Sequence, residues 1–205
     1  MNKIVVVQDD IEIEAESYSG VKVEWLGDNA ILKIYSPCTF VNSTIQIGNN
    51  GLVEVGKNSN IRNLFCRCAS DCSKVIIGKN FNIESGQFIL ARGQKNQSIV
   101  IGDNCLFSSS IFIQTSDGHA ILDKNGKVLN NTGGHISIGN HCWLGHSVSV
   151  LKKASIPDDV VVAESAVVTK KYTRSNCILG GVPAKILKVN IYWDIRAPEL
   201  MNGEK

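Results

Sequence analysis

The chain has 205 residues, 43% hydrophobic and 20% charged, which is enough for one domain with a substantial core. Its 21 basic and 19 acidic residues give a net charge of +2, which argues against a nucleic-acid-binding protein with a basic stripe. No apolar run approaches the roughly 20 residues that span a bilayer, and the first ten residues lack the apolar core of a signal peptide. We therefore expect a cytoplasmic protein without a membrane span, whose seven cysteines are reduced.

Residues 1–44 are rich in strand-forming side chains but show no clear repeat, as in Val5–Val7 and Ile31–Ile34. We interpret them as an irregular N-terminal β segment, made of degenerate early coils or a cap. Clearer repeats begin at residue 45. The cysteines of residues 62–74 follow no common zinc spacing, so we expect free thiols there and no metal.

A hydrophobic residue recurs every six positions in the middle of the chain, and Lys95 is the one interruption. The column consists of Ile77, Ile83, Ile89, Ile101, Phe107 and Ile113. Glycine follows several hydrophobic column residues, at Gly48, Gly56, Gly78, Gly102, Gly139 and Gly145. Because glycine readily adopts a positive φ, these glycines predict tight corners between short strands.

The repeat breaks after Ile113, because the next column residue is Ile138 instead of a residue six positions later. The intervening residues 115–135 are polar and rich in turn-forming Gly, Asp and Asn. Long insertions in a compact repeat protein are usually functional. We therefore predict a protruding functional loop over residues 115–135.

The repeat is most regular after this loop, where two columns run in parallel. The first is Ile138, Leu144, Val150, Ile156, Val162 and Val168, and the second is Ile136, Cys142, Val148, Ala154, Val160 and Ala166. Neither a helix of period 3.6 nor an alternating strand produces a period of six. Three strands of six residues give a triangular coil of 18, so Ile138 is expected to stack on Ile156. We predict a parallel β-helix over residues 45–180, followed by an exit turn and tail over 181–205.

Three segments together resemble the hexapeptide-repeat acyltransferases: Ile138–His146, Ala166–Lys171 and Gly180–Leu187. The resemblance covers about residues 75–190. It implies an all-β, left-handed parallel β-helix. It also implies a homotrimer with active sites between subunits and acetyl-CoA as the acyl donor.

The loop contains Ser-Asp-Gly-His-Ala-Ile, which resembles the Ser-Asp-x-His-x-Ile segment of bacterial polysaccharide and sialic-acid O-acetyltransferases. In those enzymes the histidine is catalytic, which implies that His119 is the general base. Imidazole suits this role because its pKa lies near neutrality. Asp117 either orients His119 or forms a turn beside Gly118. Trp143 lies between column positions, so its indole should point outward, toward the active site or a subunit interface.

The resemblance also implies an acetyl-CoA site. His146 matches the residue just after the family's Trp-aliphatic-Gly triplet, which contacts the acetyl donor. Glu164 aligns with a position that contacts the donor through its backbone. Thr169 and Lys170 match a Thr-Lys pair along the pantetheine and phosphate path. Lys185 matches the basic residue near the nucleotide phosphates.

We therefore expect an acetyl-CoA-dependent O-acetyltransferase that acts on a hydroxyl of a sugar or polysaccharide, with capsular sialic acid among the candidates. No cysteine matches a family nucleophile, so direct transfer is expected. One alternative is a zinc enzyme like the γ-class carbonic anhydrases, with His141 and His146 as paired ligands and His119 or His135 as the third. The other is a non-catalytic β-helix scaffold.

Overall fold

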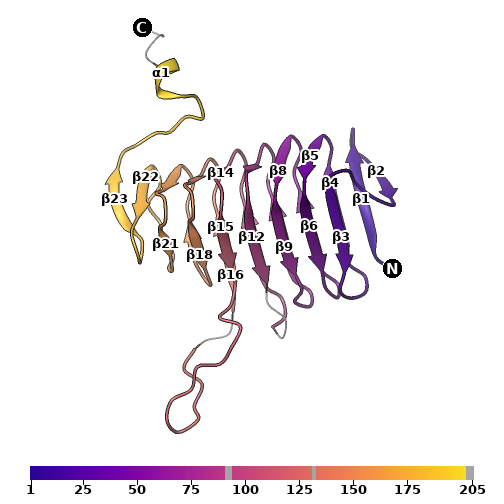
Figure 1. The fold of residues 1–205 in the computed structure, drawn as a ribbon, viewed down its shortest axis with the longest axis horizontal. Coiled ribbons are helices and arrows are strands. Elements are labelled where there is room, and N and C mark those ends of the chain that lie inside the picture. The colour runs from indigo at the N-terminus through magenta and orange to yellow at the C-terminus, as the bar shows by residue number, and fades with distance from the viewer. Residues whose placement is uncertain (91–93, 131–132, 202–205) are drawn as a thin grey trace.

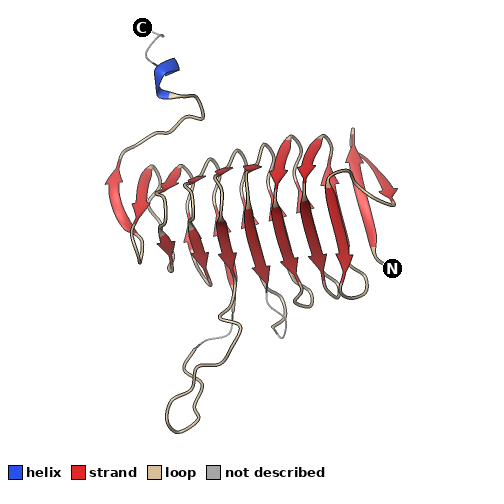
Figure 2. Cartoon of the chain, in the orientation of Figure 1, coloured by secondary structure: helices blue, strands red, loops and turns tan. Residues whose placement is uncertain are grey.

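A computed structural model describes residues 1–90, 94–130 and 133–201. The described chain is almost entirely β-strand and winds into a parallel β-solenoid of about six turns (Figure 1). Its one helix, α1 (Pro198–Met201), lies in the tail that extends away from the solenoid (Figure 2). The parallel β-helix predicted from the six-residue period is thus confirmed.

Three parallel sheets form the faces of the solenoid. Sheet A consists of β2 (Ile11–Ala15), β1 (Lys3–Gln8), β4 (Ile31–Tyr35), β7 (Leu52–Val55), β10 (Lys74–Ile77), β13 (Ser98–Ile101), β16 (His135–Ile138) and β19 (Ser155–Ile156). Sheet B consists of β3 (Val21–Trp25), β6 (Ser43–Ile47), β9 (Leu64–Cys68), β12 (Gly86–Leu90), β15 (Ile111–Gln114), β18 (Ser149–Leu151) and β21 (Val167–Val168). Sheet C consists of β5 (Cys38–Val41), β8 (Ser59–Arg62), β11 (Asn82–Ile83), β14 (Leu106–Phe107), β17 (Trp143–Leu144), β20 (Val160–Val162), β22 (Cys177–Gly180) and β23 (Lys185–Val189). All pairs are parallel except β1 with β2 and β22 with β23.

The two columns predicted after the loop fill the interior of the solenoid. Every member of both columns is buried. Strand pairing places Ile138 on Ile156 and Leu144 on Val162, so the turn there is 18 residues as predicted. Burying one such aliphatic side chain contributes about 1.5–3 kcal/mol, so stability accumulates turn by turn.

Earlier turns are longer than 18 residues, which shifts the column. Val53 pairs with Val75, and Val75 pairs with Ile99. The prediction that Ile89 belongs to the interior column is wrong, because Phe88 pairs with the core residue Ile113 and leaves Ile89 facing outward. Phe88 lies five residues after the buried Ile83, where the period requires six. The chain therefore returns to the core one position earlier than predicted.

The predicted role of the corner glycines is also wrong. None of Gly48, Gly56, Gly78, Gly102, Gly139 and Gly145 has a positive φ. Glycine is needed instead because successive coils touch at the corners: a Cβ on Gly78 would lie 2.6 Å from the carbonyl carbon of Gly102. The positive φ falls two residues later and mostly on asparagine, as at Asn80 and Asn104, since asparagine tolerates this conformation better than other non-glycine residues.

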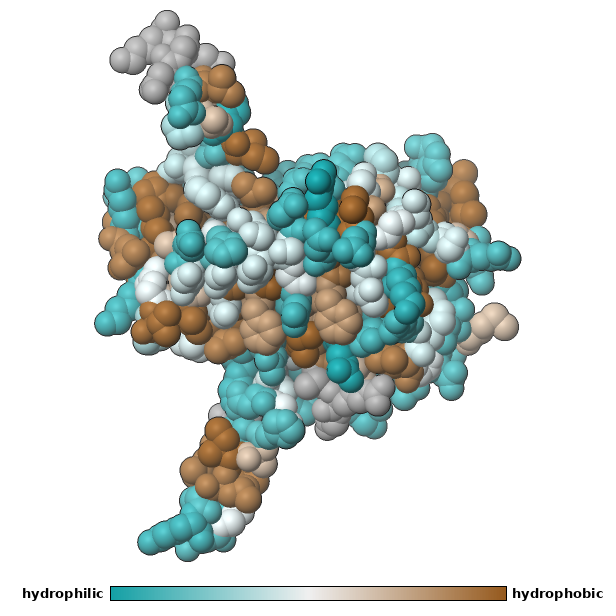
Figure 3. All heavy atoms as spheres, in the orientation of Figure 1, coloured by the Kyte–Doolittle hydropathy of each residue, from teal (hydrophilic) through white to brown (hydrophobic). Residues whose placement is uncertain are grey.

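The predicted loop protrudes between β15 and β16, with His135 already in β16 (Figure 1). Its tip is a small hairpin in which Leu122 bridges Val128 and the Leu129 amide donates to the Ile121 carbonyl at 2.7 Å. These four apolar side chains are all exposed, and they form the hydrophobic patch near the end of the loop in Figure 3.

Strands that precede residue 44 pair with strands that extend past it, as β3 with β6 and β4 with β7 do. The proposed boundaries at residues 44 and 180 remain predictions. All seven cysteines carry free thiols, and burial raises the pKa of the Cys66 thiol well above its usual range. No helix in the described part of the chain has the length and apolar character needed to cross a membrane.

Candidate active site

His119 lies in the protruding loop with its side chain exposed. Gly118, which precedes it, has a φ of +77°, a conformation that side-chain-bearing residues rarely adopt. Asn130 holds the backbone around it: Nδ2 donates to the His119 carbonyl at 2.8 Å, and Oδ1 accepts from the Ile121 amide at 2.8 Å. Within the described residues the imidazole itself has no hydrogen-bond partner, so both ring nitrogens are available to a substrate. A cavity of about 180 Å³ adjoins it, lined by Gln94, Asp117, Gly118, Ala120, Val128 and Asn130.

Asp117 forms its contacts with residues other than the His119 ring. Its Oδ2 accepts from Asn130 Nδ2 at 2.8 Å and forms an ion pair with the Lys152 ammonium. Lys152, and then Asn130, lowers the pKa of the Asp117 carboxyl below its usual range. The carboxylate reaches His119 only through Asn130, so its predicted role in orienting the base remains a prediction.

Trp143 opens β17 and points outward from sheet C, as its position between the columns predicts, with 39% of its surface exposed. Its ring centroid lies 5.9 Å from that of Trp193, in the segment after β23. A cavity of about 600 Å³ runs beside it along sheet C, lined mainly by Asn60, Arg62, Asn82, Glu84, Leu106 and Ile195.

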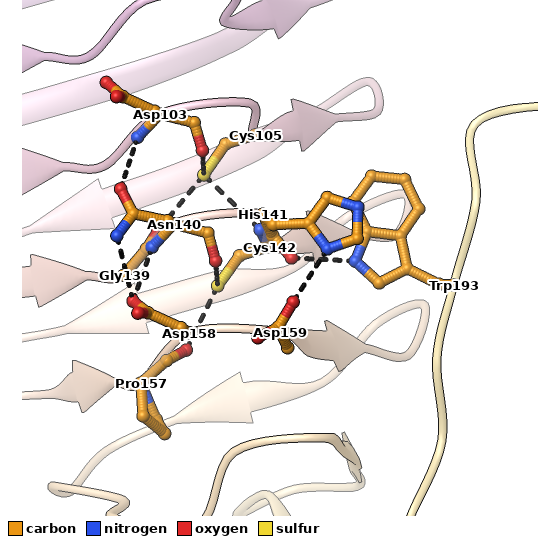
Figure 4. A network of polar contacts seen from close by, with 10 residues as sticks. All are labelled: Asp103, Cys105, Gly139, Asn140, His141, Cys142, Pro157, Asp158, Asp159 and Trp193. Carbon is orange, nitrogen blue, oxygen red and sulfur yellow. Dashed lines mark hydrogen bonds and ion pairs between the residues drawn. The ribbon is translucent and has the colours of Figure 1, made fainter.

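The C-terminal segment is attached to this face through His141 (Figure 4). The Trp193 indole stacks on the imidazole with centroids 4.4 Å apart, and its Nε1–H donates to the His141 carbonyl at 2.7 Å. His141 Nδ1 lies 2.9 Å from Asp159 Oδ1 on the next coil. Beneath it, Cys142 Sγ donates to the Pro157 carbonyl at 3.2 Å, which ties two coils together. The segment therefore has a fixed anchor beside Trp143.

We expect Trp193→Phe to lower the free energy of unfolding by about 1 kcal/mol, because phenylalanine keeps the stacking but loses the indole hydrogen bond. Trp193→Ala should cost more, since it also loses the ring contact with His141. Urea denaturation of the three proteins measures both differences. Equal stability of Trp193→Phe and the wild type would show that this hydrogen bond contributes nothing.

The predicted acetyl-CoA residues lie on successive coils at the C-terminal end. His146 and Glu164 are both exposed, and the Ser165 amide donates to the His146 carbonyl at 2.9 Å, so their segments are adjacent. His146 Nδ1 lies 2.7 Å from Ser109 Oγ. A Cβ on Gly145 would lie 2.8 Å from the Glu164 amide nitrogen. The absence of a side chain at Gly145 therefore lets the Glu164 backbone lie close to it, independently of the Glu164 side chain.

The two predicted lysines share one end of the solenoid. Thr169 and Lys170 follow β21, and Lys185 opens β23. The Tyr172 hydroxyl donates to the Ala184 carbonyl, which holds the exit turn of Lys185 beside the segment of Lys170. Both lysines are exposed and neither forms an ion pair within the described residues. Their charges are available to phosphate groups.

The four histidines occupy separate settings within one chain. His135 Nδ1 lies 2.8 Å from Ser98 Oγ, whereas His141 and His146 bond to Asp159 and Ser109. No three His, Cys, Asp or Glu side chains come together as a metal site anywhere in residues 1–90, 94–130 or 133–201.

The sequence predicts no role for three residues of these sites, Asn130, Lys152 and Trp193. Asn130 and Lys152 lie 13 and 35 positions after Asp117, and Trp193 lies 52 after His141. No local pattern connects residues at such separations. Only the outward position of Trp143 offered a signal, because an exposed indole needs a covering partner.

No family model matches the chain. The polysialic acid O-acetyltransferase of Neisseria meningitidis is 36% identical over 170 residues, which cover 82% of this chain and 77% of that protein. The polysialic acid O-acetyltransferase of Escherichia coli O1:K1 is 34% identical over 141 residues. That match covers 69% of this chain but 44% of the E. coli protein, so the chain spans less than half of its length.

The crystal structure of the polySia-specific acetyltransferase NeuO has the same fold, with a TM-score of 0.80 at 27% identity. The match covers 99% of this chain and 90% of that one. The Neisseria relative is similar over most of both sequences, and the solved structure extends the likeness to the whole solenoid. The chain therefore belongs to the hexapeptide-repeat family of acetyl-CoA-dependent O-acetyltransferases, and its fold is their left-handed parallel β-helix.

Proposed function

We propose that the protein transfers an acetyl group from acetyl-CoA to a hydroxyl of a sialic acid polysaccharide. The observation that carries this proposal is the 36% identity to the Neisseria polysialic acid O-acetyltransferase over 170 residues. The second relative, from E. coli, carries the same name.

His119 is the general base of the proposed reaction. One ring nitrogen removes the proton from the acceptor hydroxyl, and the oxygen attacks the thioester carbonyl carbon. The tetrahedral oxyanion is stabilised by a backbone N–H together with the Trp143 indole N–H. When the C–S bond breaks, the imidazolium returns its proton to the CoA thiolate. The products are the acetyl ester and CoA, with no acyl-enzyme intermediate.

Acetyl-CoA binds along the C-terminal coils in this proposal. His146 and the Glu164 backbone contact the acyl end, and Thr169 and Lys170 line the path toward the phosphates. Lys185 pairs with the nucleotide phosphates. The support is the exposed position of Lys170 and Lys185 at one end of the solenoid, without carboxylate partners among the described residues.

The active site is proposed to form between subunits of a homotrimer. His119 and Trp143 line different cavities with no lining residue in common. The loop that carries His119 and the tail that lies beside Trp143 leave the solenoid on opposite sides (Figure 1). A neighbouring subunit brings one to the other, and it also covers the exposed apolar patch near the end of the loop at Leu122 and Val128 (Figure 3).

We place the reaction in the cytoplasm, on polysaccharide destined for the capsule. The support for a reducing compartment is the set of seven free thiols, because paired cysteines would mark an oxidising one.

A thiol-release assay with acetyl-CoA tests the proposal against a panel of acceptors. The panel holds polysialic acid, monomeric sialic acid, a neutral polysaccharide and simple galactosides. CoA release that depends on polysialic acid, with a base-labile acetyl ester detected on the polymer, is the expected result. Release with a neutral acceptor alone contradicts the substrate. No release at all, together with about one zinc per chain in metal analysis, contradicts the reaction class.

A further inference from the structure

The loop of His119 is tied to the solenoid by three side chains, Lys152, Asp117 and Asn130, which we call the loop clamp. Asn130 is its inner member. Its Nδ2 donates both to Asp117 Oδ2 and to the His119 carbonyl, each at 2.8 Å, and its Oδ1 accepts from the Ile121 amide at 2.8 Å. One side chain thus binds the Asp117 carboxylate and also holds the loop backbone at the predicted base and two residues after it.

Lys152 is the outer member of the clamp and belongs to the rigid part of the fold. It directly follows β18, whose last residue, Leu151, pairs with Gln114 at the end of β15. The loop leaves the solenoid immediately after Gln114. The Lys152 ammonium therefore extends from the next coil onto the Asp117 carboxylate, with 26% of its side chain exposed.

The clamp affects the position of the predicted base, because His119 lies on an exposed loop. Its imidazole has no side-chain partner within the described residues, so only the backbone fixes where the ring lies. Misplacing a catalytic group by about 1 Å can cost about 100-fold in rate. The clamp connects Lys152 on the solenoid to Asp117, Asp117 to Asn130, and Asn130 to the backbone of His119.

We propose that Lys152 and Asn130 are positioning residues of the acetyl transfer, which hold His119 against the acceptor through the Asp117 carboxylate. This inference rests on the proposed role of His119 as the base. Both side chains act through the backbone that carries His119. Their removal lets the loop backbone move, which lowers the fraction of enzyme with a correctly placed base and leaves donor binding intact.

Lys152→Met, Asn130→Ala and His119→Ala test the clamp in the full-length protein with acetyl-CoA and the polysialic acid acceptor. We expect Lys152→Met and Asn130→Ala each to lower kcat by about 10- to 100-fold, while KM for acetyl-CoA changes less than about twofold. Lys152→Arg should restore kcat to within about threefold, since it keeps the ion pair. Because the members act in series, the double variant should be no slower than the slower single variant.

Lys33→Met is the matched control, because Lys33 forms a similar ion pair with Glu12 and 24% of its side chain is exposed. It should keep wild-type kcat. Wild-type kcat in Lys152→Met and Asn130→Ala, with His119→Ala inactive, overturns the clamp and leaves the base intact. Equal losses in Lys152→Met and Lys152→Arg also overturn it. Wild-type turnover in His119→Ala contradicts the base itself, and the clamp with it. Thermal unfolding of each variant separates lost positioning from lost folding.

Discussion

His119→Ala is expected to lower kcat by about 100- to 10,000-fold, the range typical of a removed general base. The acceptor hydroxyl then has no group to take its proton as it attacks the thioester. Acetyl-CoA should bind as before, because the predicted donor residues lie on the C-terminal coils and none lies in the loop. Steady-state kinetics measure the first effect, and isothermal titration with CoA measures the second.

His135→Ala is the matched control for this prediction. His135 stands at the other end of the same insertion, at the start of β16, and bonds to Ser98. Its loss should leave kcat near the wild-type value. If His119→Ala kept full turnover, or if it lost CoA binding along with turnover, the assignment of His119 as the base would be wrong.

The fold was predictable from sequence where the repeat is strict. Between Ile138 and Val168 the two columns determine every inward residue, and the 18-residue turn places Ile138 on Ile156. Upstream, the corners vary in length, and a period of six then assigns the wrong residue, as it did at Ile89. The sequence does not reveal the length of a corner, because that length depends on how closely two coils approach each other, as Gly78 and Gly102 do.

The candidate site was predictable only in part. The motif around His119 and the outward position of Trp143 are local features, so the sequence carries them. The contacts that support them are long-range: Lys152 reaches Asp117 from the next coil, and Trp193 returns from the tail to cover His141. In a solenoid, the lengths of the intervening turns decide which distant residues come into contact. The inserted loop gives the turn from Ile99 to Ile136 a length that no repeat predicts.

Phe107→Ala is expected to lower the free energy of unfolding by about 3–5 kcal/mol, as large aromatic truncations in a packed core do. Phe107 is 1% exposed, and its ring packs edge-on against Phe81 at 4.9 Å and Phe88 at 6.5 Å between ring centroids. The three rings pack together in the interior of the solenoid. A methyl group in place of the central ring leaves a void that short strands, held on both sides by neighbouring coils, cannot easily close.

The loss should also affect the active site, because Phe107 pairs with Leu144 and the preceding residue, Leu106, pairs with Trp143. Each coil contacts only its neighbours, so local opening at β14 should reach β17 first. Urea denaturation at fixed chain concentration measures the stability, and hydrogen exchange at the Leu144 amide measures the local opening. Phe107→Leu, which fills part of the void, should cost less than half as much as Phe107→Ala. A cost below about 1 kcal/mol for Phe107→Ala would contradict the packing of the three rings, since a buried phenylalanine in a rigid coil has no inexpensive replacement by alanine.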